Sequence, residues 1–367
     1  TDPMKTEFSA VLEGKERISL QEFPLLDIGE DDGLMRVEMS GVCGSDYAWF
    51  HEKVKLPEYP VILGHEILGR IEKLGKKAAD RLGLAEGDRV VVESRIGCDG
   101  CRYCKAGHYV FCEKELGYGT TVSCARPPHL WGAYGEYLYI APGTRVHKIA
   151  ESVPAEAAVL TCGVLANGIR WVHQKGGVGI GDVVVVEGVG QQGLAAIIAS
   201  KEAGAHLVIA TGVSRDEKRF ELAREFGADY AFDIEAPGTI ERILDLTEGY
   251  GADVVVDATS SPAALQTAIE LVRKRGTVVS AGLKGTLTRT PIDVDKVALN
   301  EIRLQGVFTH DAESVVPTIR LLESGKHPVE KMVTHRFKVS EAEKAIQCVG
   351  RQLEGEDPIK VVILPEV

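Results

Sequence analysis

Four cysteines stand close together in one short stretch of the chain, at Cys98, Cys101, Cys104 and Cys112. Two Cys-x-x-Cys steps allow a single loop to surround a tetrahedral ion, and a closed set of four thiolates leaves no coordination position for a substrate. The spacing therefore predicts a structural zinc site. Buried or disulfide-bonded cysteines are the alternative, which is less favoured because disulfides are rare in reducing compartments. His108 lies in the same stretch, and we expect it to be a surface residue.

Three further potential ligands are dispersed along the chain. Gly41-Val-Cys-Gly-Ser-Asp46 contributes Cys43, Gly64-His-Glu66 contributes His65, and Cys162 stands far downstream. Each of these residues alone is more often part of the packing than a ligand. Together they offer two thiolates and one imidazole, and three protein ligands with an open fourth position are the coordination expected of a catalytic zinc. The second prediction is thus a zinc site that is open to a substrate.

A glycine-rich turn, Gly188-Val-Gly-Gln-Gln-Gly193, follows the expected buried strand 182–187 and precedes a helical pattern over 194–203. This motif between a strand and a helix is typical of a dinucleotide site. The glycines allow the pyrophosphate to approach the backbone, and the helix N-terminus supplies N–H groups. A plain strand-to-helix turn is the alternative. We predict that the turn binds a nicotinamide cofactor.

The choice between NAD and NADP depends on the residues beyond that turn. Sites that prefer NAD carry an acid about 20 residues after the glycine motif, where it binds the ribose 2′-hydroxyl. Here the first acid is Asp216. Without an earlier acid a 2′-phosphate is not repelled, which favours NADP, and the side chains that could bind this phosphate are Ser214, Arg215, Lys218 and Arg219. The alternative for Ser214 is a capping box, Ser214-Arg-Asp-Glu217, which would start the next helix with either cofactor.

The predicted cofactor-binding residues are Gly188, Gly190, Gln191, Gln192, Gly193, Thr211, Gly212, Ser214, Arg215 and Arg219.

The sequence pattern changes near residue 181. Residues 5 to about 155 alternate short apolar runs with Gly, Pro and Asp turns, which predicts a compact β-rich domain. From residue 181 onward, continuous apolar strands alternate with helical segments, which predicts βαβ units and a parallel sheet covered on both faces. Two helical segments near 314–324 and 340–348 and a last strand over 359–363 complete the chain. The predicted fold class is α/β.

Composition limits the classes of protein that this chain can form. Its 367 residues fit two domains, and its 44% apolar and 26% charged residues are typical of a globular protein. The formal net charge of -12 disfavours nucleic acids and anionic membranes as partners. No apolar run reaches the roughly 18 to 20 residues that cross a bilayer. We expect a cytoplasmic protein that acts on a small neutral molecule.

The order of these motifs resembles that of the zinc-dependent medium-chain alcohol dehydrogenases, over nearly the whole chain from Met4. The motifs are Gly-Val-Cys-Gly-Ser-Asp, Gly-His-Glu, the four-cysteine stretch, Leu160-Thr-Cys-Gly163 and the glycine turn. The resemblance implies a GroES-like catalytic domain, residues 4–158 and 310–367, interrupted by a doubly wound Rossmann domain, residues 159–309. It also implies a homo-oligomer, for which we favour a tetramer over a dimer.

Residue by residue, the resemblance makes Cys43, His65 and Cys162 the ligands of the catalytic zinc. The chain departs from the best-known members in two places. Ala48 stands where some relatives carry a relay histidine, and His51 comes three residues too late. Polyol dehydrogenases usually carry a Glu-Pro pair where this chain has Cys162 and the glycine after it, which weakens a sorbitol-like interpretation.

The resemblance also implies roles for the residues beside these ligands. Asp46 would accept a hydrogen bond from a ligating imidazole. Glu66 would lie next to the metal, either hydrogen-bonded or transiently coordinating it. Ser45 would pass the alcohol proton outward, because a hydroxyl both accepts and donates. The alternatives are helix-capping or turn residues for Asp46 and Ser45 and a surface charge for Glu66.

The implied reaction is hydride transfer between a primary or secondary alcohol and NAD(P)+, giving an aldehyde or a ketone. Zinc would act as a Lewis acid on the alcohol, with two zinc ions per subunit, one catalytic and one structural. A sugar or polyol dehydrogenase of the same family is the alternative. A zinc-ribbon nucleic-acid binder would account for the four-cysteine stretch, but it leaves the glycine turn unexplained.

Overall fold

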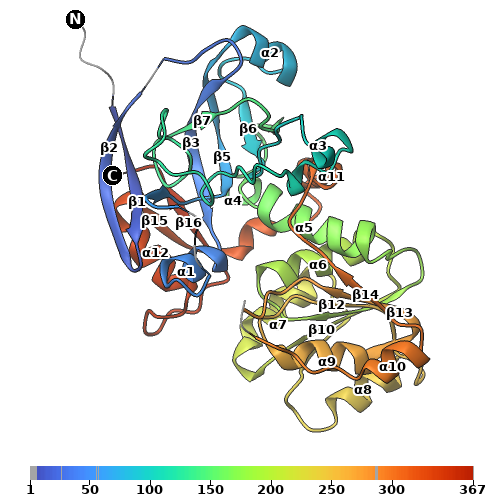
Figure 1. Cartoon of the computed structure of the whole chain (residues 1–367). Helices are drawn as coiled ribbons and strands as arrows, with labels where there is room; N and C mark the ends of the chain where they lie inside the picture. The colour runs from blue at the N-terminus through green and yellow to red at the C-terminus, as the bar shows by residue number, and fades with distance from the viewer. Residues whose placement is uncertain (1–5, 26, 55, 57, 286–287, 367) are drawn as a thin grey trace, which may run out of the picture. The chain divides into compact units, whose positions relative to one another are not determined.

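The computed structural model describes residues 6–25, 27–54, 56, 58–285 and 288–366. The chain divides into two compact units (Figure 1). One consists of Thr1–Gly163 with Val315–Val367, and the other is Val164–Ser314. Both divisions fall a few residues after the positions proposed from the sequence. The first unit is therefore built from both ends of the chain, and the second is a continuous insertion.

The first unit is rich in β-structure, and its described residues form two sheets that are antiparallel except for one pair of strands. The smaller sheet has the order β2-β1-β4, and the larger has the order β15-β16-β3-β5-β6-β8, with β7 paired to β3. The exception is the parallel pair of β15 and β16. The bounds of these strands are β1 (Thr6–Gly14), β2 (Arg17–Pro24), β3 (Gly33–Val42), β4 (Val61–Ile62), β5 (Glu66–Leu74), β6 (Arg89–Val92), β7 (Tyr137–Ile140), β8 (Val146–Lys148), β15 (Val333–Lys338) and β16 (Lys360–Leu364).

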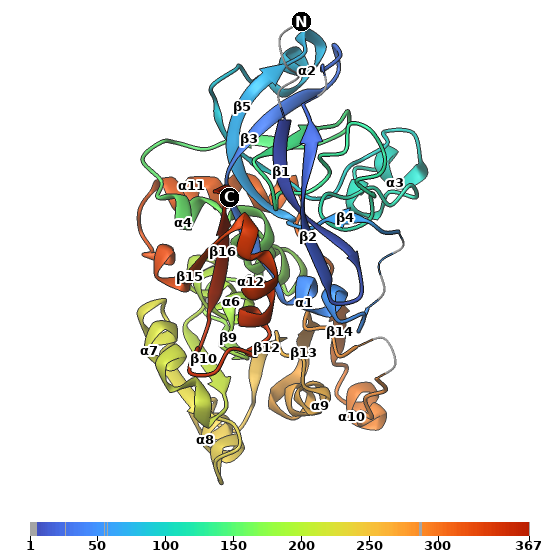
Figure 2. The ribbon, with the colours of Figure 1, turned by 90° about the vertical axis from the view of Figure 1, so that its left-hand side faces the viewer.

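The last strand ties the C-terminal segment to the N-terminal sheet. β16 runs antiparallel to β3, with Val361 opposite Val42. Helix α12 (Ala342–Val349) packs on β16, as Figure 2 shows, and Ile346 belongs to the same buried cluster as Val361. The other helices labelled in or at the edge of this unit are α1 (Gly44–Phe50), α2 (Lys76–Leu82), α3 (Arg102–Lys105), α4 (Ala155–Ala158) and α11 (Ala312–Glu323).

The second unit is a parallel sheet with the strand order β11-β10-β9-β12-β13-β14. Its strand bounds are β9 (Val183–Glu187), β10 (Leu207–Gly212), β11 (Tyr230–Asp233), β12 (Ala252–Asp257), β13 (Val272–Ser280) and β14 (Arg303–Gly306). Its helices are α5 (Ala166–Ile169), α6 (Gln191–Glu202), α7 (Glu217–Glu225), α8 (Thr239–Leu246), α9 (Pro262–Leu271) and α10 (Val294–Leu299). The strand order reverses direction between β9 and β12, and ligands of doubly wound sheets bind at the carboxyl ends of the strands at such a point. The predicted α/β class is confirmed.

A buried acid in the smaller sheet makes the stability of the first unit depend on pH. Glu7 is fully buried on β1, where it accepts hydrogen bonds from the Ser9 hydroxyl at 2.8 Å and from the backbone N–H of Glu136 at 3.0 Å. Burial, which outweighs these hydrogen bonds, raises the pKa of Glu7 to about 7. The folded protein therefore retains a proton on Glu7 that the unfolded chain releases near pH 4.5.

We expect the Glu7→Gln variant to become more stable relative to the wild type as pH rises from about 4.5 to 8. The wild type loses stability over this window because a raised carboxyl pKa favours folding only at low pH, and the limit of the effect is about 3 kcal/mol. Urea unfolding at pH 5 and pH 8 measures it. Glu13→Gln, which changes an exposed residue on the same strand, is the matched control. The prediction is contradicted if the difference in unfolding free energy between Glu7→Gln and the wild type is the same at both pH values.

Candidate metal and cofactor sites

The four-cysteine stretch folds into a loop that gathers all four thiols. The sulfur atoms of Cys98, Cys101, Cys104 and Cys112 all lie within 4.8 Å of one another, and those of Cys98 and Cys104 are 4.0 Å apart. A tetrahedral ion with Zn–S bonds of about 2.3 Å requires sulfur-to-sulfur distances of about 3.8 Å. The loop therefore has the size and the donor chemistry of a zinc site. His108 is exposed, as expected.

Backbone N–H groups in this loop point at the sulfur atoms. The N–H of Cys101 donates to the Cys98 sulfur at 3.4 Å, and the N–H of Cys104, in the first turn of α3, donates to the Cys101 sulfur at 3.5 Å. A backbone hydrogen bond from Glu113 is the largest of the contributions that lower the pKa of Cys101 to about 6. Because such bonds favour the thiolate, the sulfur atoms of Cys98 and Cys101, whose pKa values are both lowered, are suited to a cation. All eight cysteines of the chain lie among the described residues, and none forms a disulfide.

A second group of donors lies where two strands of the larger sheet meet. Cys43 follows the end of β3 and is the N-cap of α1, while His65 precedes β5 and Glu66 begins it. β3 and β5 are antiparallel with Gly41 opposite Glu66, so strand pairing brings the two short motifs together. The donor atoms of Cys43, His65 and Glu66 all lie within 4.8 Å of one another.

Asp46 orients the imidazole of His65. Its Oδ1 is 3.4 Å from His65 Nδ1, while its Oδ2 accepts the backbone N–H of Cys43 at 2.8 Å and the Tyr134 hydroxyl at 3.0 Å. Burial by itself lowers the pKa of His65, but the neighbouring Asp46 and Cys43 outweigh it and hold that pKa well above the usual range. With Nδ1 directed at a buried carboxylate, Nε2 is the nitrogen that remains for a metal.

Glu66 is held at this position by a buried lysine. Lys360, the first residue of β16, donates from Nζ to Glu66 Oε2 and to the carbonyl oxygen of Val42 at 3.1 Å. The side chains of both partners are fully buried. Glu66 Oε1 is buried and has no hydrogen-bond partner within the described part of the chain. One carboxylate oxygen is thus neutralised, and the other remains available beside Cys43 and His65.

Cys162 lies next to this group but outside the set of described donors that fall within 4.8 Å of one another. It belongs to the helical turn Thr161–Leu165 and is buried. Burial, followed by the negative charges of Glu93 and Glu66, raises the pKa of Cys162 well above its usual range. A side chain at Gly163 would begin 2.6 Å from Glu66 Cγ, so the residue after Cys162 packs directly on Glu66.

Of Ser45 and His51, which were considered for proton transfer, only Ser45 lies beside the imidazole of His65. Ser45 Oγ is 3.4 Å from His65 Nε2, on the side away from Asp46. His51 is at the other end of α1, where its Nδ1 contacts Glu16 at 2.7 Å. The structure thus brings Ser45 to the candidate metal ligands and directs the His51 imidazole to Glu16.

Sequence reasoning did not identify Lys360 or Tyr134, which hold Glu66 and Asp46. Lys360 interrupts the apolar run of the last strand, and a lysine in a buried strand is a signal for a buried carboxylate partner. Tyr134 carries no comparable local signal.

The glycine turn has the backbone conformation that a phosphate-binding turn requires. Gly188 has φ +92°, a conformation that L side chains rarely adopt, and Gly190 is the N-cap of α6. A side chain at Gly193 would collide with the carbonyl oxygen of Gly188, so glycine is needed where the helix approaches the strand. Gln191 and Gln192 form the first turn of α6, and Gln192 Oε1 accepts a hydrogen bond from the Asn167 amide at 3.3 Å.

The residues at the carboxyl end of β10 divide into buried and exposed ones. Thr211 and Gly212 are buried, whereas Ser214 and Arg215 are exposed. Asp216 is used internally, because its Oδ2 accepts the backbone N–H of Val213 at 3.0 Å and its Oδ1 accepts from the buried Arg219 at 3.2 Å. Ser214 is not the N-cap of the next helix, as the alternative interpretation expected: it begins the 3-10 turn Ser214–Asp216, whose N-cap is Val213, and the N-cap of α7 is Asp216.

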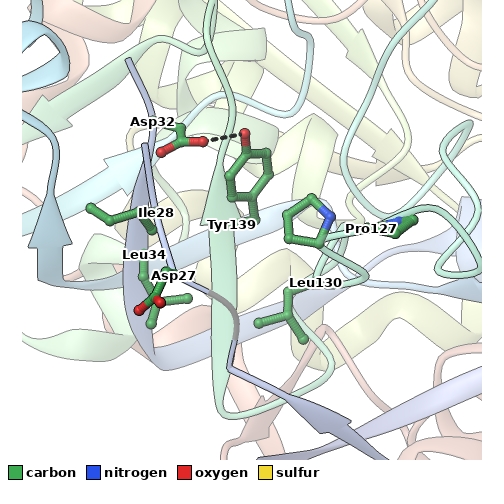
Figure 3. Close-up of a pocket in the computed structure, with 8 residues that line it drawn as sticks. Asp27, Ile28, Asp32, Leu34, Pro127, Leu130 and Tyr139 are labelled. Carbon is green, nitrogen blue, oxygen red and sulfur yellow. Dashed lines mark hydrogen bonds between the residues drawn. The ribbon is translucent and has the colours of Figure 1, made fainter. Parts of the chain in front are cut away.

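A separate surface hollow of about 260 Å³ lies in the first unit (Figure 3). The Tyr139 hydroxyl donates to Asp32 across its wall at 2.8 Å. The lining residues include none of the predicted site residues; they are Asp27, Ile28, Asp32, Leu34, Pro127, Pro128, Leu130 and Tyr139. Among the described residues, no helix combines the length and apolar character that a membrane span requires.

Comparison with known proteins gives consistent matches over both units. Residues 29–151 match the alcohol dehydrogenase GroES-like domain, and residues 193–324 match the zinc-binding dehydrogenase domain. A probable alcohol dehydrogenase of Mycobacterium tuberculosis is 37% identical over 361 residues, with 97% of each chain covered. An erythritol/L-threitol dehydrogenase of Mycolicibacterium smegmatis is 31% identical over 372 residues, also with 97% of each chain covered.

Solved structures agree with these sequence matches. An alcohol dehydrogenase of Thermotoga maritima superimposes with a TM-score of 0.90 at 28% identity, covering 99% of this chain and 100% of that one. A protein described as a zinc-binding dehydrogenase of Sinorhizobium meliloti, bound to NADP, gives a TM-score of 0.87 at 25% identity, covering 98% and 100%.

The chain therefore belongs to the zinc-dependent medium-chain alcohol dehydrogenase family. It is a zinc-binding oxidoreductase, and dependence on NAD or NADP is typical of this family. The predicted family and the combination of a GroES-like domain with a Rossmann-like parallel sheet are confirmed.

We expect Asp46→Asn to weaken zinc retention by roughly 10- to 100-fold, because an amide in place of the carboxylate orients and polarises a ligating imidazole less well. Competition with a chromogenic chelator, followed by metal analysis, measures the loss. Asp80→Asn, at an exposed position in the same unit, is the control and should retain zinc as the wild type does. If Asp46→Asn holds zinc as tightly as Asp80→Asn, the imidazole does not depend on this carboxylate.

Proposed function

We propose that this protein catalyses the reversible oxidation of a primary or secondary alcohol to an aldehyde or ketone, with NADP+ as the preferred hydride acceptor. The observation that carries the proposal is the convergence of Cys43, His65 and Glu66 donor atoms within 4.8 Å, with Cys162 adjoining them. Thiolate, imidazole and carboxylate are zinc donors, and a set of three or four from separate segments suits a site that keeps a position for substrate.

Each residue of this group has a separate role in the proposed reaction. Zinc held by Cys43, His65 and Cys162 would supply the Lewis acidity that lowers the pKa of the alcohol hydroxyl. Asp46 holds Nδ1 of the imidazole, which leaves Nε2 for coordination. Ser45, 3.4 Å from Nε2, has the hydroxyl that accepts the alcohol proton and passes it outward.

The cofactor part of the proposal rests on the glycine turn and the end of β10. The nicotinamide ring supplies the hydride acceptor, and the protein's contribution is to bind and orient it. Asp216 supports NADP over NAD because both of its oxygens are engaged by the backbone of Val213 and by Arg219. It is therefore poorly suited to bind a ribose 2′-hydroxyl, whereas the exposed Arg215 is suited to a 2′-phosphate.

The substrate is proposed to be a simple alcohol rather than a polyol. Gly163 supports this choice, because the Cβ of the proline in a polyol-type Glu-Pro pair would lie 2.6 Å from Glu66 Cγ, closer than an ordinary contact. A sugar or polyol substrate is the second candidate, and the 31% identical erythritol/L-threitol dehydrogenase favours it. A screen of alcohols, polyols and hydroxy acids, followed through absorbance of the reduced nicotinamide, distinguishes the two.

Three further features belong to this proposal. Each subunit holds two zinc ions, the second in the loop of Cys98, Cys101, Cys104 and Cys112. The protein acts as a homotetramer. It works in the cytoplasm, which agrees with eight cysteines that form no disulfide among the described residues.

We expect Cys43→Ala and His65→Ala each to lower turnover by at least about a thousandfold and zinc content from two ions to one per subunit, because the catalytic metal is lost. Titration of cofactor fluorescence should show unchanged cofactor affinity. Cys348→Ala, a buried cysteine outside both groups, is the control for loss of a thiol. The proposed mechanism is wrong if a variant shown to lack the catalytic zinc ion retains turnover.

We expect kcat/KM with NADPH to exceed that with NADH, and Arg215→Ala to reduce this preference by about tenfold, the loss of one charged contact to a phosphate. The exposed Lys274→Ala, on another strand of the same unit, should leave the preference unchanged. A wild-type preference for NADH contradicts the assignment of NADP.

A further inference from the structure

A partly buried lysine joins two loops at the carboxyl edge of the parallel sheet. Lys284 stands in the segment after β13, and its side chain is 12% exposed. Its Nζ donates to Asp257 Oδ2 at 2.6 Å, to the carbonyl oxygen of Thr259 at 2.7 Å and to Thr259 Oγ1 at 3.3 Å. All three acceptors follow or end β12. One ammonium group therefore ties the loop after β13 to the loop after β12.

Thr259 is the residue that this arrangement holds in place. Its backbone N–H and its hydroxyl donate to Asp257 Oδ1, at 3.0 and 2.9 Å. The backbone N–H groups of Ala281 and Gly282 donate to the carbonyl oxygen of Asp257 at 3.0 and 2.9 Å, which ties the two loops together a second time. Asp257 is fully buried, so its charge depends on Lys284 for compensation.

Thr259 in turn packs against the cofactor turn. A side chain at Gly188 would begin 3.0 Å from Thr259 Cγ2, so the threonine methyl lies directly against the first glycine of the turn. Asp257 is paired in register with Glu187, the residue before Gly188. These residues occupy the carboxyl ends of β9 and β12, where the strand order reverses and where a dinucleotide binds in a doubly wound sheet.

The charges around Lys284 explain why a cation is needed there. Glu187 and Asp257 are two buried carboxyl groups on adjacent strands. Burial and then the charge of Asp257 raise the pKa of Glu187 well above its usual range, and Lys284 acts in the opposite direction. Glu187 Oε2 has no hydrogen-bond partner among the described residues. Removal of the ammonium group would leave the two acids facing each other beside the position of the cofactor phosphates.

We propose that Lys284 is a positioning residue for the nicotinamide dinucleotide, which holds Thr259 against the Gly188 turn and compensates Asp257. The inference rests on the proposed cofactor site but adds a residue that no glycine motif contains. Its action is indirect, through the loop geometry, and it predicts an effect on cofactor affinity that is separate from the zinc chemistry of the first unit.

The test uses the full-length, zinc-loaded enzyme and titrates NADPH and NADH by fluorescence. Lys284→Met should raise the Kd of both cofactors by at least about tenfold, because a buried charged hydrogen-bond network loses its donor. Zinc content and kcat at saturating cofactor should stay within about twofold of wild type, so that the defect is in KM for the cofactor. Lys284→Arg, which retains the charge, should recover most of the affinity.

Two further variants make the test decisive. Lys274→Met removes an exposed lysine from β13 and should bind cofactor as the wild type does. If Lys284→Met does not fold, the double variant Asp257→Asn/Lys284→Met, which leaves no uncompensated charge, is titrated in its place and should still bind weakly. If the folded Lys284→Met variant or the double variant binds the cofactor as tightly as the wild type does, the inference about Lys284 is wrong and the proposed function is unaffected. A wild-type enzyme that binds neither NADPH nor NADH overturns the proposed function and the inference with it.

Discussion

The buried ion pair between Lys360 and Glu66 is the contact on which the arrangement of the candidate metal ligands depends. Both side chains are fully buried, and loss of one partner of such a pair costs roughly 3–5 kcal/mol because the other charge remains buried and uncompensated. Lys360 also donates to the carbonyl oxygen of Val42, the residue before Cys43. One ammonium group therefore fixes both the strand end that carries Cys43 and the carboxylate that lies beside His65.

The surroundings of Glu66 show how backbone packing leaves room for this pair. Gly41 faces Glu66 across the strands, and Gly163 approaches it from the helical turn that carries Cys162. A side chain at either glycine would occupy the space of the Glu66 side chain. The absence of two side chains thus matters as much as the presence of the donors, because a displaced Glu66 would lose either Lys360 or its place beside His65.

In both units a lysine from another segment compensates the charge of a buried carboxylate. In the first, Lys360 reaches Glu66 from a strand at the C-terminal end of the chain, and in the second, Lys284 reaches Asp257 from the loop after the neighbouring strand. In each unit the carboxylate stands at an end of a strand, since Glu66 begins β5 and Asp257 ends β12. A lysine is suited to this task, since a flexible stem brings a compact charge with several donors to acceptors from different segments.

The sequence by itself determined the features that local spacing and periodicity encode. The four-cysteine loop could be predicted because all its donors lie in one short segment, and the parallel sheet because its strands are continuous apolar runs separated by helices. The capping box considered as the alternative for Ser214 is not formed, because α7 begins after Asp216, which is its N-cap. Only the tertiary structure decided that Lys360 meets Glu66, that Tyr134 supports Asp46 and that Lys284 holds Thr259. Such contacts arise from strand pairing and loop packing between segments far apart in the chain, and no local pattern encodes which segments will meet.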